Sequence, residues 1–190
     1  MEPSPELYTE SAVFMFHSRS RDAPPGRGAG ERLEPPLGPD DFRELAAIAD
    51  WRRLLSNFAE SPFTLDGLRW LSVEHCFQAH KFRTVAPSYF RSFALDSGSE
   101  LSRTLGAAVK RAGGRRGHPL DGAARARWEQ EKHALQERAL AEKYSQSATH
   151  RAALLATGRA KLTHKPARSP QTIIERGLMR VRQRLQRGRA

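Results

Sequence analysis

Apolar residues predict three short strands in the first half of the chain. Residues 12–16 (AVFMF) form an unbroken apolar run that suits a buried strand and is too short for a convincing helix. Residues 63–65 and 68–70 are rich in apolar side chains and flank Asp66-Gly67. Because this dipeptide adopts the positive φ angles of a two-residue type I′ turn, the segment predicts a β-hairpin.

Helical spacing of apolar residues predicts helices elsewhere. A helix with Asp40 as its N-cap carries four apolar residues on one face, namely Phe42, Leu45, Ala46 and Ala49. Residues 123–143 are rich in Ala, Glu, Arg and Leu, and an apolar stripe runs through Trp128, Leu135 and Ala139. On these residues alone, Trp128 is a packed tryptophan of a core helix.

Two further helices are predicted near the carboxyl end. One spans residues 149–157 and stops at Gly158, a residue typical of the position after a helix. The other has Ser169 as its cap and Pro170 at its first position. Its apolar stripe consists of Ile174, Leu178, Val181 and Leu185.

These elements predict a mainly helical α+β fold with a small β element made of the strand at 12–16 and the hairpin. A chain of 190 residues has the size of one domain. We expect that domain over residues 12–186, with a disordered tail at 1–11 and a basic tail at 187–190.

A line of polar side chains marks the helix that follows the hairpin. Ser72 is suited to cap that helix, and Glu74, Gln78 and Lys81 then fall at positions i, i+4 and i+7 on one line. Aromatic residues border the line on both sides, namely Phe77 and Phe82. Such borders favour the wall of a cleft over a solvated face. The alternative interpretation is an ordinary first-turn glutamate and a surface lysine.

The net charge of +11 indicates anionic partners. Residues 1–50 carry ten acidic and five basic side chains, so the remaining part of the chain has a charge of +16. Such a charge attracts phosphates and equally favours nonspecific binding to nucleic acid. A cluster at Lys110, Arg111, Arg115 and Arg116 is either a phosphate contact or a solvated basic loop.

Cysteine content and hydropathy narrow the class of protein. The single cysteine, Cys76, allows no intrachain disulfide and no cysteine metal cluster, and its neighbours predict a small buried side chain. No apolar run approaches the about 20 residues of a membrane span, and the first ten residues are acidic. We therefore expect a soluble, intracellular, cytoplasmic protein.

A loop rich in proline and glycine follows the first strand. Its sequence, DAPPGRGAGE, lets backbone N–H groups approach an anion, but it is neither a Walker A nor a GxGxxG motif. A plain connector is the alternative.

The stretch from Leu55 to Phe82 resembles the NADAR family, also called YbiA-like. The residues that match its hallmark are Ser56, Asn57, Phe58, Pro62, Asp66, Gly67, Trp70, Glu74, His75, Phe77, Gln78, Lys81 and Phe82. A second block, HPL…W…ALAEKYSQ…LLATG, is also similar to the family, and Trp128 matches its pocket-lining tryptophan. The resemblance implies an N-glycosidase of YbiA-like fold.

The resemblance also implies roles for individual residues. Glu74 becomes the catalytic carboxylate, Lys81 a candidate nucleophile and Trp128 a substrate contact. The amides of Asn57 and Gln78 can bind ribose hydroxyls or a base edge, and the alternative is that they satisfy local backbone groups. The serine-rich strand end and the PGxGxGE-like loop are similar to a subgroup of the family, which makes Ser18, Arg19 and Arg27 candidates for holding substrate phosphate. The family's acidic residue before the last helix is missing here. If that residue assists catalysis, His164 or another group replaces it, or the protein is slower or prefers another substrate.

The implied substrate is a phosphorylated ribosyl compound, either ADP-ribosylated guanine, free or in nucleic acid, or a ribosylaminopyrimidine phosphate of riboflavin synthesis. We expect no cofactor, metal or membrane partner. Two other classes stay open: a non-catalytic module that binds ADP-ribose or a nucleotide, and a basic nucleic-acid-binding protein.

Overall fold

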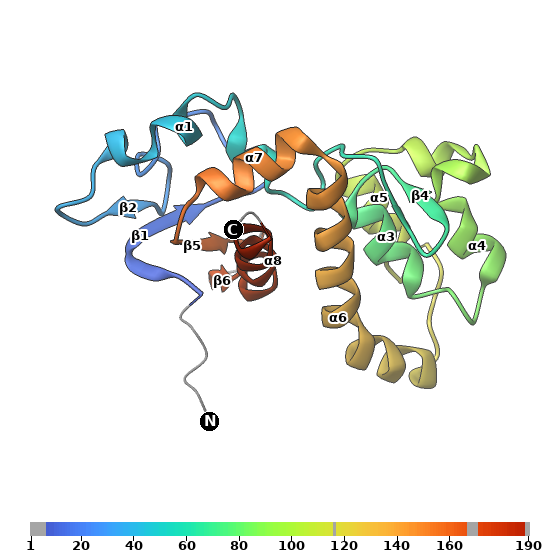
Figure 1. Ribbon diagram of the computed structural model, residues 1–190. Helices are drawn as coiled ribbons and strands as arrows, with labels where there is room; N and C mark the ends of the chain where they lie inside the picture. Colours follow the sequence, from blue (N-terminus) through green and yellow to red (C-terminus); the bar gives the residue numbers. More distant parts are fainter. Residues whose placement is uncertain (1–6, 116, 167–170, 189–190) are drawn as a thin grey trace. The chain divides into compact units, whose positions relative to one another are not determined.

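The computed structural model describes residues 7–115, 117–166 and 171–188, and it has a mainly helical α+β fold (Figure 1). The chain forms two compact units. The first unit contains Met1–Ser56 and Ala148–Ala190, and the second contains Asn57–Ser147. Some residues used in the sequence predictions lie outside the described ranges: Arg116, Ser169, Pro170 and residues 1–6 of the predicted tail.

The first unit is built on a four-stranded sheet with the order β2-β1-β5-β6. Its strands are β1 (Thr9–Met15), β2 (Arg32–Leu33), β5 (Ala160–His164) and β6 (Ile173–Ile174). β1 and β5 are parallel, whereas β2 and β6 pair antiparallel with their neighbours. The strand expected at 12–16 thus begins earlier, at Thr9, which pairs with Ala160 of β5 before the register shifts ahead of Val13.

Helices of the first unit surround this sheet. They are the 3₁₀ helix η1 (Pro39–Phe42), α1 (Arg43–Ala46), α2 (Trp51–Leu54), α7 (Ala148–Ala156) and α8 (Arg176–Arg187). α7 contacts α1, α2 and α8, and α8 contacts β5. Edge-to-face contacts of Phe14 with Phe42 and Trp51 join the sheet to the helices, with ring centroids 4.9 and 5.3 Å apart. α7 ends as predicted, with Gly158 in the left-handed region at a φ of 58°.

The helix predicted after Asp40 is wrong in detail. Gly38, not Asp40, precedes the first turn, and its backbone N–H donates to the Asp41 carboxylate at 2.7 Å. The helix is broken into η1, α1 and α2, and Asp50 takes a left-handed φ of 53° between the last two. As a result, Ala46 and Ala49 are exposed rather than buried.

The last helix also begins later than predicted. α8 starts at Arg176, and Ile174 pairs with Thr163 as part of β6 instead of opening the apolar stripe of the helix. The physical reason is that β-branched residues 173–174 extend the sheet at β5, which local helical periodicity does not register. Leu178 and Val181 do face the core, each with 1% of its surface exposed.

The second unit contains the hairpin and the remaining helices. Its elements are β3 (Phe63–Leu65), β4 (Leu68–Trp70), α3 (Val73–His80), α4 (Pro87–Ser92), η2 (Leu95–Ser97), η3 (Glu100–Arg103), α5 (Ala107–Ala112) and α6 (Gly122–Gln146). The hairpin forms its own two-stranded sheet, separate from the sheet that contains β1. α4, α5 and α6 all contact α3, which makes α3 the central helix of this unit.

The hairpin turn confirms the sequence prediction. Asp66 and Gly67 have φ angles of 53° and 76°, and Phe63, Thr64 and Leu65 pair with Trp70, Arg69 and Leu68. The hairpin is fixed to α6, because the Gln146 side chain exchanges two hydrogen bonds of 2.8 and 2.9 Å with the Thr64 backbone. Asp66 also forms an ion pair with Arg138 of α6. Among the described residues, no helix is long and apolar enough to cross a membrane.

Candidate active site

Two hydrogen bonds fix the start of α3. The Ser72 hydroxyl accepts a hydrogen bond from the His75 backbone N–H at 3.4 Å, which confirms Ser72 as the cap. The Asn57 carbonyl accepts from the Glu74 backbone N–H at 2.9 Å. Asn57, expected to bind substrate through its side chain, is therefore placed beside Glu74 by its backbone.

Glu74, Gln78 and Lys81 form a continuous hydrogen-bonded line along α3, which we call the polar line. Gln78 Nε2 donates to Glu74 Oε1 at 2.7 Å, and Lys81 Nζ donates to Gln78 Oε1 at 2.5 Å. Only 6% of the Glu74 surface and 4% of the Gln78 surface is exposed. The line is thus a buried structural feature and not a solvated helix face.

Chemistry determines the orientation of the Gln78 amide in this line. An ammonium group can only donate and a carboxylate can only accept, so the amide oxygen must face Lys81 and the amide nitrogen must face Glu74. Gln78 therefore bridges an acid and a base, and both ends of its amide are engaged.

Gly113 completes the surroundings of the lysine. Its carbonyl accepts from Lys81 Nζ at 2.9 Å. A Cβ atom at this position would lie 1.9 Å from Gln78 Oε1 and 2.6 Å from Gln78 Cβ, so only glycine lets the end of α5 approach α3 this closely. α5 is also fixed by the Tyr89 hydroxyl, which donates to the Ala112 carbonyl at 2.9 Å.

Aromatic rings border one side of the polar line. Phe77 and Trp128 make an edge-to-face contact with ring centroids 4.7 Å apart, and Lys81 Nζ lies 5.8 Å from the centroid of the Trp128 ring. Trp128 is 7% exposed and sits on the buried stripe of α6 with Leu135 and Ala139, as predicted. The site thus combines a carboxylate, an amine and an aromatic plane.

Burial changes the acid–base chemistry of this helix. It lowers the pKa of Lys81, against the opposing effect of the Glu74 carboxylate, and the positive charge of Lys110 lowers it further. A lysine with a lowered pKa has a larger neutral, nucleophilic fraction at a given pH. Cys76 is buried, as predicted, and burial raises the pKa of its thiol.

Ser18 and Arg19 are exposed in a tight turn after β1 in the first unit. The His17 backbone N–H donates to Ser20 Oγ at 3.0 Å, and the Arg19 backbone N–H donates to His17 Nδ1 at 3.1 Å. These bonds shape the turn while the Ser18 and Arg19 side chains point to solvent, where they can meet an anion.

His164 stands at the end of β5, the parallel neighbour of β1. Its Nδ1 lies 2.7 Å from Glu175 Oε1, and its ring stacks on Phe16 with centroids 6.4 Å apart. A carboxylate in contact with one imidazole nitrogen fixes the orientation of the ring. Glu175 is a partner that the sequence did not reveal, because its proximity follows from the pairing of β5 with β6.

The loop rich in proline and glycine already binds an anion, the carboxylate of its own Glu31. The backbone N–H groups of Gly26 and Gly28 donate to Glu31 Oε2 at 3.1 and 3.0 Å. Arg52 donates to both Glu31 oxygens at 2.7 Å, and the two side chains are 3% and 0% exposed. These N–H groups are already hydrogen-bonded and consequently do not form a phosphate site. The loop is a connector held in place by Glu31 and Arg52, and Arg27 of this loop is exposed.

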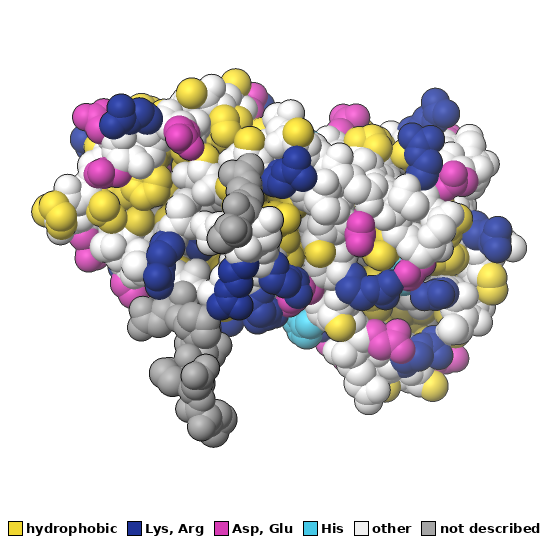
Figure 2. All heavy atoms as spheres, viewed as in Figure 1, with side chains coloured by type: hydrophobic (Ala, Val, Ile, Leu, Met, Phe, Trp, Pro, Cys, Tyr) yellow, Lys and Arg dark blue, Asp and Glu magenta, His cyan; other side chains and the backbone are white. Residues whose placement is uncertain are grey.

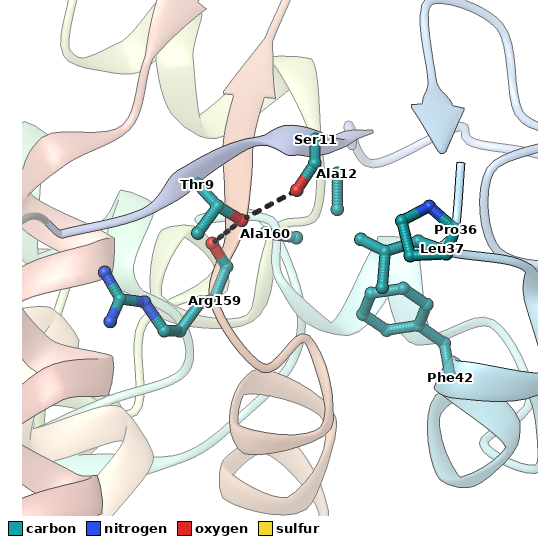
Figure 3. Close-up of a pocket in the computed structure, with 8 residues that line it drawn as sticks. All are labelled: Thr9, Ser11, Ala12, Pro36, Leu37, Phe42, Arg159 and Ala160. Carbon is teal, nitrogen blue, oxygen red and sulfur yellow. Dashed lines mark hydrogen bonds between the residues drawn. The ribbon is translucent and has the colours of Figure 1, made fainter. Parts of the chain in front are cut away.

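A separate pocket in the first unit holds none of the predicted site residues (Figure 3). It has a volume of about 390 Å³ and is lined by Thr9, Ser11, Ala12, Pro36, Leu37, Phe42, Arg159 and Ala160. Figure 3 shows the Thr9 hydroxyl between Ser11 and the Arg159 carbonyl, with both contacts at 3.4 Å. This mainly apolar hollow lacks a carboxylate and is not the candidate active site. Across the described ranges, no group of three or more His, Cys, Asp or Glu side chains is arranged to hold a metal ion.

Comparison with known proteins gives a consistent family signal. The NADAR domain model matches residues 48–169, more than half of the chain. The N-glycosidase YbiA of Escherichia coli strain K12 and that of Shigella boydii serotype 4 are each 39% identical over 108 residues. That segment covers 56% of this chain and 59% of the length of each relative. The NMR structure of the E. coli protein YbiA has the same fold, with a TM-score of 0.60 and 24% identity over 97% of this chain and 91% of that one.

Proposed function

Because the chain belongs to the NADAR domain family, we propose that it is an N-glycosidase that cleaves the bond between a base and a phosphorylated ribose. The observation that carries this proposal is the polar line beside Trp128, in which a buried carboxylate and a lysine of lowered pKa share one helix. The curated relatives named N-glycosidase YbiA support the same reaction class.

Glu74 acts on the sugar in this proposal. Cleavage of an N-glycosidic bond places positive charge on the ribose, and a carboxylate near the anomeric carbon stabilises that charge. In the hydrolytic route, a water oxygen bonds to the anomeric carbon, the base leaves with the bonding electrons, and a water proton passes to Glu74. Glu74 then passes this proton to the departing base, which leaves neutral, and the carboxylate is restored.

Lys81 offers a covalent route to the same products. As a neutral amine, its Nζ attacks the anomeric carbon and the base leaves with the bonding electrons and takes up a proton. Ring opening of the sugar then gives an imine on Lys81, which water hydrolyses. The two hydrogen-bond acceptors of Lys81, Gln78 Oε1 and the Gly113 carbonyl, fix Nζ in place for either route.

Trp128 and Phe77 supply the contact for the base. An aromatic plane can stack on a nucleobase and can face a cationic transition state. For Ser18, Arg19 and His164 we propose contacts to phosphate or ribose, since a hydroxyl, a guanidinium and a carboxylate-oriented imidazole all suit an anionic sugar phosphate.

One incubation experiment tests the function. The protein is mixed with an ADP-ribosylated guanine nucleotide and, separately, with a ribosylaminopyrimidine phosphate, and released base is measured by mass spectrometry. Release from either compound that depends on Glu74 supports the proposal and identifies the substrate. Binding of either compound without release would instead indicate a non-catalytic module.

A further inference from the structure

The exposed face of α8 carries a row of arginines, which we call the arginine ridge. It consists of Arg176, Arg180, Arg184 and Arg187, all exposed. At about 100° per residue these four positions lie within an arc of about 80°. α8 contains no acidic residue. Figure 2 shows Lys and Arg side chains gathered where Figure 1 draws α8.

The opposite face of α8 packs in the core of the first unit. Leu178, Met179 and Val181 are at most 1% exposed. A fifth arginine, Arg182, is also buried on this face, where it donates to Thr157 Oγ1 at 2.8 Å and to the Leu7 carbonyl at 3.1 Å. One face of the helix is therefore packed in the core, where Arg182 makes structural hydrogen bonds. The arginines of the other face are exposed to solvent.

Charge and length make the arginine ridge suitable for contact with several phosphates at once. Successive ridge arginines four residues apart are separated by about 6 Å along the helix, and the whole ridge extends over about 16 Å. Duplex nucleic acid presents one phosphate per about 1.7 Å of its axis. Guanidinium groups bind phosphate oxygens in a bidentate manner, and the chain as a whole has a charge of +11.

We propose that the arginine ridge is a docking surface for the sugar-phosphate backbone of a nucleic acid, bound without sequence preference. This binding surface is independent of the proposed glycosidase chemistry. An anionic membrane is the less suitable partner, because amphipathic helices bind membranes by inserting an apolar face, and the apolar face of α8 is already buried. With no aromatic residue in α8, the contact is expected to be electrostatic rather than based on stacking.

The test uses an unmodified, fluorescein-labelled oligonucleotide, single-stranded and duplex, and measures affinity by fluorescence anisotropy across about 50 to 200 mM salt. The ridge variant replaces all four ridge arginines by Gln. The control variant replaces four exposed arginines outside α8 by Gln and thus loses the same charge: Arg43, Arg91, Arg103 and Arg125. A third variant with Lys at the ridge positions restores the charge, and thermal melting verifies that all variants fold.

The ridge variant should bind at least about 10-fold more weakly than wild type at 0.1 M salt, and its slope of log K against log salt should be shallower by about 3. The control variant should bind nearly as well as wild type, and the Lys variant should recover most of the affinity. Equal losses in the ridge and control variants would overturn the proposal in favour of bulk charge. The proposal would also be overturned if the protein did not bind the oligonucleotide. Ridge-dependent binding of phosphatidylserine vesicles that exceeds oligonucleotide binding would overturn it as well. Because no base is released from this probe, the outcome is separate from that of the glycosidase test.

Discussion

Gln78 donates a hydrogen bond of 2.7 Å to Glu74 one helical turn earlier, and this contact holds the carboxylate in one orientation. The same amide accepts from Lys81. Gln78 is therefore best described as a positioning residue for the two proposed catalytic groups. Its predicted role as a direct ligand of the ribose would require one of these bonds to open.

Replacing Glu74 by Gln tests the catalytic carboxylate. The amide keeps the shape and a hydrogen-bond acceptor for Gln78 but loses the negative charge that stabilises the transition state. Base release should fall by at least about 100-fold, while ligand affinity and melting temperature change little. Near wild-type turnover would show that Glu74 is only a first-turn glutamate of α3, and unfolding of the variant would show a structural role.

Replacing Gly113 by Ala tests the geometry of the polar line. The added methyl group would overlap Gln78 Oε1, so Gln78 must move and both of its bonds must change. We expect kcat for base release to fall at least about 10-fold, because small misplacements of catalytic groups are costly. Gly122→Ala is the matched control, since a Cβ there meets nothing within 4 Å. Equal activity of the two variants would argue against a role for this close approach.

Borohydride trapping separates the two proposed routes. If Lys81 forms an imine with the sugar, reduction during turnover should fix a sugar adduct on Lys81 that peptide mass spectrometry locates. The Lys81→Arg variant, which cannot form the imine, is the control for adducts at other lysines. Rapid turnover without any adduct would favour attack by water assisted by Glu74.

Replacing Glu31 by Gln tests whether the buried Glu31 carboxylate stabilises the loop rich in proline and glycine. The change leaves the buried Arg52 guanidinium without its anionic partner, and breaking a buried ion pair costs about 3 to 5 kcal/mol of the free energy of unfolding. Glu34→Gln, which removes the exposed pair with Arg32, should cost less than about 1 kcal/mol. Urea denaturation of both variants measures the difference, and similar costs would mean that the Glu31 contacts do not stabilise the fold.

Acid should destabilise the second unit through His75. Burial lowers the pKa of His75 from 6.5 to about 4, although backbone groups of Thr104 and Leu101 act in the opposite direction. The unfolded chain thus binds a proton more readily between pH 6.5 and 4, so stability present above pH 6.5 is lost as pH falls through this window, by about 3 kcal/mol in total. The pKa of buried His80 is also lowered, which acts in the same direction.

Urea unfolding at pH 7 and pH 5 checks this expectation, with His75→Gln as the comparison. Loss of the histidine should reduce the difference in unfolding free energy between the two pH values. An unchanged difference would assign the pH dependence to other groups.

Local sequence determined those features that depend on a few neighbouring residues. Asp66-Gly67 specifies the hairpin turn, Ser72 specifies the start of α3, and the composition of residues 122–146 specifies α6. The alignment of Glu74, Gln78 and Lys81 also follows from helical periodicity. These predictions succeeded because capping, turn geometry and periodicity act within one or two helical turns.

Tertiary structure decided the contacts between residues that are far apart in the sequence. The pairing of Ile174 with Thr163 turned an expected helix start into a strand, and the carboxylate of Glu31 filled a glycine-rich loop that resembled a phosphate cradle. The missing side chain of Gly113 lets α5 reach Gln78 and Lys81, a contact between elements that are separate in the sequence. Such contacts depend on close packing between elements far apart in the chain, and no local periodicity encodes which elements will meet.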